Sequence, residues 1–73
     1  MPSIQKHRRL LGESVRSARK RQGFSQEKLA EKADLSTVFI SRIERGVESP
    51  SVDNLQKIAK ALGVRVTYLV AGF

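Results

Sequence analysis

The fold is decided by the stretch SQEKLAEKADLSTVFISRIER, residues 25–45. Residues 26–33 and 37–45 each carry apolar side chains at helical spacing, and a short turn at residues 34–36 separates them. The apolar positions that would face inward are Leu29, Ala30, Ala33, Ile40 and Ile43. Two short helices joined by such a turn are the geometric unit of a helix-turn-helix.

Glycines and serines divide the rest of the chain into further helices. Helical patterns run from about Arg8 to Gln22 and from Val52 to Leu62. Glycines that stop helices follow the patterns, and serines that cap helices precede them. These are Gly23, Gly46 and Gly63, and Ser25, Ser36 and Ser51. The inward positions of the two flanking helices are Leu11, Val15, Ala18, Val52, Leu55, Ile58, Ala59 and Leu62.

The C-terminal tail, residues 64–73, is rich in valine. We expect one short helical piece in it, around Thr67–Val70. A strand is the alternative, because Val64, Val66 and Tyr68 alternate with polar residues.

Composition limits the class of protein. The chain has 73 residues, enough for one domain, and 14 Lys and Arg against 7 Asp and Glu, a formal net charge of +7. Such a charge attracts nucleic acid or an acidic membrane surface, unless it only keeps the surface solvated. Without cysteine, disulfides and cysteine-based zinc sites are excluded, and we expect no metal and no cofactor. Without a long apolar run, we expect a soluble, cytoplasmic protein with no membrane partner.

The outward side of residues 37–45 is the candidate reading surface. Nine residues at about 1.5 Å rise give roughly 13 Å, which suits a DNA major groove about 12 Å wide. Arg42 can pair with guanine through two hydrogen bonds, and short side chains can make hydroxyl or methyl contacts. The alternative is a polar face that is only solvated. The candidate residues are Ser36, Thr37, Val38, Ser41 and Arg42.

Two smaller features surround this surface. Ser25 and Gln26 stand at a helix start whose free N–H groups suit a phosphate, although ordinary capping alone explains Ser25. Arg19 and Glu44 can form a partly buried ion pair between the first and third helices, which would fix the reader's angle. The alternative is two unpaired, solvated charges.

An enzyme is not expected, because the chain has one histidine, no cysteine, no phosphate-cradling glycine loop and no convincing catalytic set. Two other classes stay open. One is a sequence-specific regulator of transcription. The other is a protein-interaction module, such as an antitoxin that neutralises a toxin, with a protein partner.

Four motifs together resemble the Cro/CI-type (XRE) helix-turn-helix family over residues 9–70. They are SQEKLA at 25–30, ISRIERG at 40–46, PSV at 50–52 and LQKIAKALGV at 55–64. The resemblance implies an all-α, compact five-helix bundle of the lambda-repressor type, with the helix-turn-helix at the second and third helices. It also implies binding to double-stranded DNA as a symmetric homodimer. Residues 8–73 would form the domain.

Site residues follow from the resemblance position by position. Gln26 matches a glutamine that contacts phosphate and base, and Arg19 with Glu44 matches an inter-helix salt bridge. The base-facing positions match Ser36, Thr37, Val38, Ser41 and Arg42, and backbone contacts match Arg19, Arg45 and Ser49, with Ser25 beside them. Phage-repressor-like members often carry glutamines at Thr37, Val38 and Arg42, so the base preference does not transfer. We expect Phe39 to pack rather than read bases.

The two ends of the chain carry the remaining expectations. Residues 1–7 form a basic N-terminal arm, which either reaches DNA or is a disordered, solvated tail. The apolar tail supplies a dimer interface at Val66, Val70 and Phe73, unless its side chains only close the intramolecular core. The expected function is a small regulator, chiefly a repressor or autoregulator. Restriction–modification controllers, phage repressors and antitoxins all fit.

Overall fold

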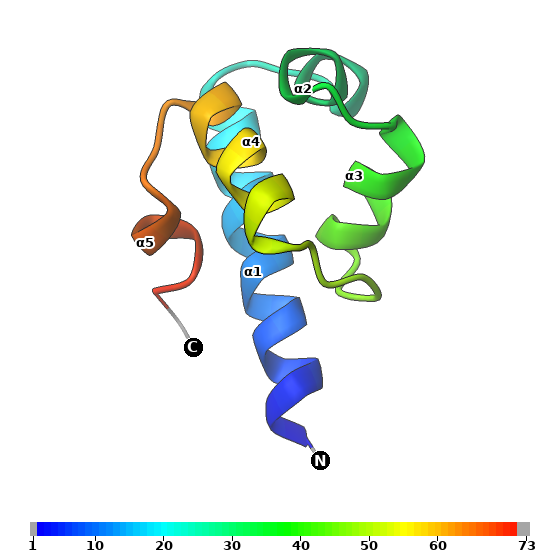
Figure 1. Cartoon of the computed structure of the whole chain (residues 1–73), viewed down its shortest axis with the longest axis vertical. Coiled ribbons are helices and arrows are strands. Elements are labelled where there is room, and N and C mark those ends of the chain that lie inside the picture. The colour runs from blue at the N-terminus through cyan, green and yellow to red at the C-terminus, as the bar shows by residue number, and fades with distance from the viewer. Residues whose placement is uncertain (1, 72–73) are drawn as a thin grey trace.

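The computed structural model describes residues 2–71, with side chains from residue 5 onward, and contains helices but no strand within that range (Figure 1). The helices are α1 (Pro2–Arg21), α2 (Gln26–Ala33), α3 (Thr37–Glu44), α4 (Val52–Leu62) and α5 (Val66–Leu69). The Cα radius of gyration is 10.9 Å. The all-α, compact five-helix architecture predicted from the sequence is confirmed.

Helix boundaries agree with the sequence at α2 and α4 and differ elsewhere. The first helix begins at Pro2 rather than near Arg8, so residues 2–7 are helical and not a separate arm. Proline fits a first helical turn because its missing N–H would have no partner there. Figure 1 shows this N-terminal part of α1 extending below the rest of the bundle. The tail piece is helical, so the strand alternative is wrong for residues 66–69.

Local capping explains why the inner helices start where they do. The hydroxyls of Ser25, Ser36 and Ser51 each accept a hydrogen bond from the backbone N–H three residues later, at 3.0, 3.0 and 3.1 Å. At the other end of α2, Asp34 has φ 57° and ψ 47°, the left-handed conformation that glycine usually supplies. These two devices set the turn between α2 and α3.

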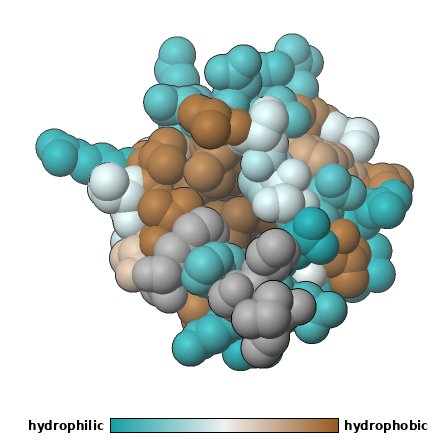
Figure 2. Space-filling view, turned by 60° about the horizontal axis from the view of Figure 1, so that its bottom comes forward, coloured by the Kyte–Doolittle hydropathy of each residue, from teal (hydrophilic) through white to brown (hydrophobic). Residues whose placement is uncertain are grey.

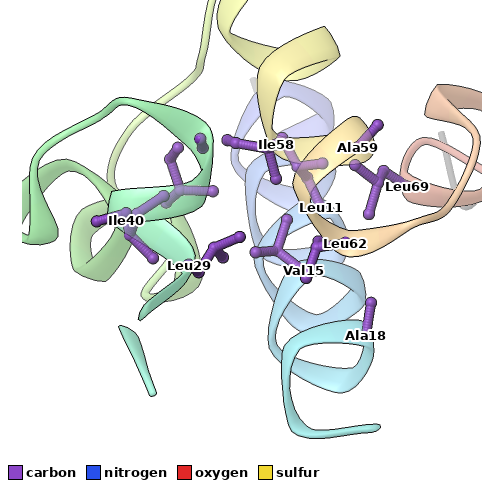
Figure 3. Close-up of a cluster of buried hydrophobic side chains, with 12 residues drawn as sticks. Leu11, Val15, Ala18, Leu29, Ile40, Ile58, Ala59, Leu62 and Leu69 are labelled. Carbon is purple, nitrogen blue, oxygen red and sulfur yellow. The ribbon is translucent and has the colours of Figure 1, made fainter. Parts of the chain in front are cut away.

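The core lies where α1, α4 and the helix-turn-helix meet. Figure 3 shows Leu11 and Val15 of α1 beside Ile58 and Leu62 of α4, with Leu29 and Ile40 closing the cluster from α2 and α3. The predicted inward positions of α1, α2 and α3 are all buried. Val52 was predicted to be inward but is 74% exposed, because the first turn of α4 extends past the end of this core.

Helix α1 approaches α3 at Gly12. A Cβ atom there would lie 2.7 Å from the backbone oxygen of Glu44 and closer still to that of Ile43. No side chain larger than hydrogen fits without movement of the two helices. Gly12 therefore sets how closely the last turn of α3 rests on α1.

The C-terminal segment is fastened to the bundle by apolar packing and by a side-chain hydrogen bond. Leu69 is 1% exposed and belongs to the core. The Arg21 Nη2 donates to the Tyr68 hydroxyl at 2.6 Å. Just before this segment, the Gln22 Nε2 donates to the carbonyl of Leu62, the last residue of α4, at 2.7 Å. Val66 and Val70 pack partly against the core. Phe73 lies outside the described residues.

Candidate nucleic-acid interface

Helix α3 divides into a packing side and an outward side. Ile40 and Ile43 have no exposed surface, whereas Val38 is 65% exposed and Arg42 is exposed. Thr37 and Ser41 are half-buried beside them. Phe39 packs partly against the core, as expected. The structure therefore brings the predicted reading residues to one side of α3, with Ser36 at its N-terminal end.

The carboxylate of Glu44 is the meeting point of three helices. Its side chain is fully buried, and Arg19 of α1 reaches both oxygens, with Nε 2.6 Å from Oε2 and Nη2 3.0 Å from Oε1. Gln26 of α2 donates its Nε2 to Oε1 at 3.1 Å, and Arg16 of α1 brings its Nε within 3.4 Å. We call Glu44, Arg19, Arg16 and Gln26 the Glu44 hub. The ion pair between Arg19 and Glu44 suggested by the sequence is present in it.

The charges in the Glu44 hub stabilise one another. Burial by itself raises the pKa of Glu44, but hydrogen bonds from Arg19, Gln26 and Arg16 outweigh it, so the pKa lies below 4.5. The hydrogen bond to Glu44 raises the pKa of Arg19. Both groups are therefore charged at neutral pH. Because the hub joins α1, α2 and α3, it fixes the angle at which α3 presents its outward side.

The Glu44 hub separates the roles of its two arginines. Arg19 is 12% exposed at its side chain, and its Nη1 also donates to the Phe24 carbonyl at 2.9 Å. All three nitrogens of Arg19 thus have acceptors in the protein. Arg16 is 47% exposed and was not singled out from the sequence. Its position three residues before Arg19, on the same side of α1, is a signal that would have found it.

The segment after α3 contains a further interaction that sequence spacing did not indicate. The Arg42 Nε lies 3.5 Å from Oε1 of Glu48, in the loop between α3 and α4. Arg45 and Ser49, predicted to contact the DNA backbone, are both exposed in the same stretch of chain. Arg42 and Glu48 are six residues apart, which is not a neighbouring spacing on a helix. The pair arises from the turn that follows α3.

Two other kinds of feature are absent from the part of the chain that the structure describes. No group of three or more potential metal ligands occurs among the residues it describes. Within the same range, no helix is both long enough and apolar enough to cross a lipid bilayer.

Comparisons with known proteins agree with this geometry. The HTH_3 family model, described as helix-turn-helix, matches residues 15–69. Control protein C.BamHI of Bacillus amyloliquefaciens is 51% identical over 59 residues, which cover 80% of this chain and 73% of that protein. Other relatives are named HTH-type transcriptional regulators, and the matches to two of them from Bacillus subtilis cover only 40% and 56% of their lengths.

Solved structures give the same answer in three dimensions. The restriction-modification controller protein C.AhdI from Aeromonas hydrophila superposes with a TM-score of 0.83 at 32% identity, covering 85% of this chain and 94% of that one. The P22 c2 repressor, in complex with a synthetic operator, superposes with a TM-score of 0.80 at 35% identity, covering 86% and 96%. The chain therefore belongs to the Cro/CI-type (XRE) helix-turn-helix family of transcriptional regulators.

Proposed function

We propose that this protein represses or autoregulates transcription by binding specific sequences of double-stranded DNA through the outward side of α3. The observation that carries this proposal is the division of α3 itself. Val38 is 65% exposed while Ile40 and Ile43 have no exposed surface. A short helix whose outward polar and small side chains are not part of the core fits the major groove, where base edges are read.

The contacts can be assigned by chemistry. Arg42 pairs with a guanine, because its guanidinium can give two parallel hydrogen bonds to guanine O6 and N7. Thr37, Val38 and Ser41, with Ser36 beside them, make hydroxyl or methyl contacts with neighbouring bases. These side chains are short, so the backbone of α3 must come close to the groove floor.

Backbone contacts would orient α3 in the groove. Gln26 and Ser25 stand at the start of α2, where free N–H groups favour a phosphate. Arg45 and Ser49 approach the DNA backbone from the C-terminal end of α3. At the Glu44 hub we assign the phosphate contact to Arg16 more than to Arg19, because Arg19 already serves three protein acceptors.

We further propose that the protein acts as a homodimer. A reader of eight residues offers few base contacts, and two copies on half-sites about 34–36 Å apart would multiply them. Apolar side chains gather in a patch left of centre in Figure 2, the side on which α5 lies in Figure 1. Val66 and Val70 of this segment are only half-buried, which supports an interface there.

Selection of bound sequences from a random duplex DNA pool tests the proposal. We expect one enriched motif with two-fold symmetry. On that motif, Arg42→Ala should weaken binding by about 1–3 kcal/mol and relax the preference at one position of each half-site. Lys57→Ala, which removes an exposed cation on α4, is the control and should keep the preference.

Two results would overturn the proposal. One is a pool that yields no enriched motif at a salt concentration where the protein still binds DNA. The other is an Arg42→Ala variant that distinguishes the selected motif from scrambled duplex as well as the parent does. An asymmetric motif bound by one copy would remove the dimer and leave DNA reading in place.

A further inference from the structure

The loop between α3 and α4 holds a carboxylate against the proposed reading arginine. Oε1 of Glu48 lies 3.5 Å from Nε of Arg42, and the two side chains are 34% and 52% exposed. An exposed ion pair contributes little to stability, about 0–1 kcal/mol. Its place beside the outward side of α3 is therefore better explained by an effect on Arg42 than by an effect on folding.

The backbone places Glu48 at this spot. Helix α3 ends at Glu44, and Gly46 follows its C-cap Arg45 with φ 76°. The Val47 N–H donates to the Arg42 carbonyl at 3.1 Å, and the Gly46 N–H donates to the Ile43 carbonyl at 3.0 Å. These two bonds are the pattern of a Schellman motif, which reverses the chain over the last turn of a helix. This reversal brings Glu48, the residue after Val47, alongside Arg42.

We propose that Glu48 is a positioning residue for DNA reading, which holds the Arg42 guanidinium in the orientation that selects guanine. This inference rests on the proposed function. The guanidinium is a planar fork with five N–H donors. Because the ion pair meets Arg42 at Nε, 3.5 Å from Glu48, the edge formed by Nη1 and Nη2 stays available for the two acceptors of guanine. Fewer orientations are then open to the Arg42 guanidinium, so it forms hydrogen bonds with other bases and with phosphates less favourably.

The charge of Glu48 adds discrimination in a second way. A carboxylate beside the DNA-facing side of α3 repels phosphates on every sequence. Only DNA with a guanine that accepts two hydrogen bonds from Arg42 compensates for this repulsion. Glu48 therefore weakens non-specific binding more than specific binding. Selectivity gained through a repulsive element of this kind is a general device of specific interfaces.

The test uses Glu48→Gln, which keeps the size of the side chain and removes its charge. Dissociation constants are measured by fluorescence anisotropy for the selected duplex, for three duplexes with the other bases at the Arg42-dependent position, and for scrambled duplex. We expect Glu48→Gln to bind scrambled DNA about three- to tenfold more tightly and to lose preference at that position by about threefold or more. Glu31→Gln, with the same change in net charge on an exposed part of α2, is the control.

A double substitution separates this inference from the proposed function. In an Arg42→Ala background, Glu48→Gln should leave the base preference unchanged, because Glu48 acts on preference through Arg42. The inference is overturned if Glu48→Gln keeps the parent's preference at that position, or changes it equally with Arg42 absent. If instead Arg42→Ala itself loses no preference anywhere, it is the proposed reader that is wrong.

Discussion

At the level of single residues, Glu44 adds a polar connection between α1, α2 and α3, which also meet in the hydrophobic core. Its carboxylate is fully buried, yet hydrogen bonds from Arg19, Gln26 and Arg16 meet it there. Buried ion pairs of this kind add little net stability over a well-packed apolar contact, but losing one partner leaves an uncompensated charge. The Glu44 hub is therefore better understood as a device that fixes geometry than as one that raises stability.

Replacing Glu44 should destabilise the domain. We expect Glu44→Gln to lower the free energy of unfolding by about 3 kcal/mol, because the Arg19 guanidinium stays behind without its carboxylate. Urea denaturation followed by circular dichroism measures this as a lower midpoint with an unchanged slope. Arg16→Gln, on the 47% exposed partner, is the control and should cost less than about 1 kcal/mol. Equal losses in the two variants would contradict the assigned hub.

The Glu44 hub also predicts how stability depends on pH. The pKa of Glu44 is lowered by folding from 4.5, so the unfolded chain takes up this proton at a higher pH than the folded chain does. The contribution of Glu44 is thus complete above about pH 4.5 and is lost as the pH falls through its folded pKa. Urea midpoints measured between pH 7 and pH 3 should fall less steeply in Glu44→Gln than in the parent. Parallel curves for the two proteins would show that Glu44 titrates alike in both states.

Gly12 gives a residue-level prediction whose sign opposes helix propensity. Alanine in place of glycine within a helix ordinarily stabilises by about 0.5–1 kcal/mol. Here the added Cβ would lie 2.7 Å from the Glu44 backbone oxygen. We expect Gly12→Ala to destabilise by about 1–3 kcal/mol instead, as overpacking does. Urea midpoints of Gly12→Ala and of the exposed α1 control Ser17→Ala decide between the two effects.

At the level of elements, the turn between α2 and α3 depends on a strained residue. Asp34 ends α2 in the left-handed conformation, and its N–H donates to the Glu31 carbonyl at 3.2 Å. The left-handed conformation costs a residue with a Cβ atom about 1–2 kcal/mol, although aspartate tolerates this conformation better than most residues. Glycine carries no such penalty.

Two substitutions at Asp34 reveal that strain. We expect Asp34→Gly to be more stable than Asp34→Ala by about 1 kcal/mol, the reverse of their order inside a helix. Thermal unfolding of both variants beside the parent measures the difference. An alanine variant as stable as the glycine variant would mean that the turn relaxes away from the left-handed conformation.

Elements with local signals were predictable and those without were not. Helices α2 and α4 match the predicted bounds because serine caps and a glycine stop mark them within the sequence. Val52 was misplaced because periodicity gives the inward side of a helix but not the point where the core ends. The close approach of α1 to α3 at Gly12 depends on tertiary structure and leaves no periodic trace. The pairing of Glu44 with Arg16, 28 residues away, leaves only the helical spacing of Arg16 and Arg19 as a sign.

At the level of the whole molecule, shape and charge are the relevant quantities. Among the residues that the structure describes, twelve buried apolar residues form the core, and the full chain has a net charge of +7. A domain of this size buries only about 60% of its unfolded surface, so it has little stability to spare. The same positive charge would make the affinity for DNA fall steeply with salt, because bound phosphates release counterions.

Salt dependence should separate backbone contacts from base contacts. We expect Arg45→Ala to weaken binding by a similar factor on all sequences and to reduce the slope of log K against log salt by about one unit. Affinities on the selected and scrambled duplexes between about 50 and 200 mM salt measure this. Loss of base preference in Arg45→Ala would instead place Arg45 among the readers.

The division of α3 has a consequence for how such a protein changes over evolutionary time. Ile40 and Ile43 carry the packing, while Val38 and Arg42 make no part of the core. Substitutions at exposed positions of this kind usually alter stability by less than about 0.5 kcal/mol. Substitutions on the outward side of α3 can therefore accumulate without compensating mutations in the core. Under the proposed function, the same scaffold can change the DNA sequence that it prefers while every intermediate still folds.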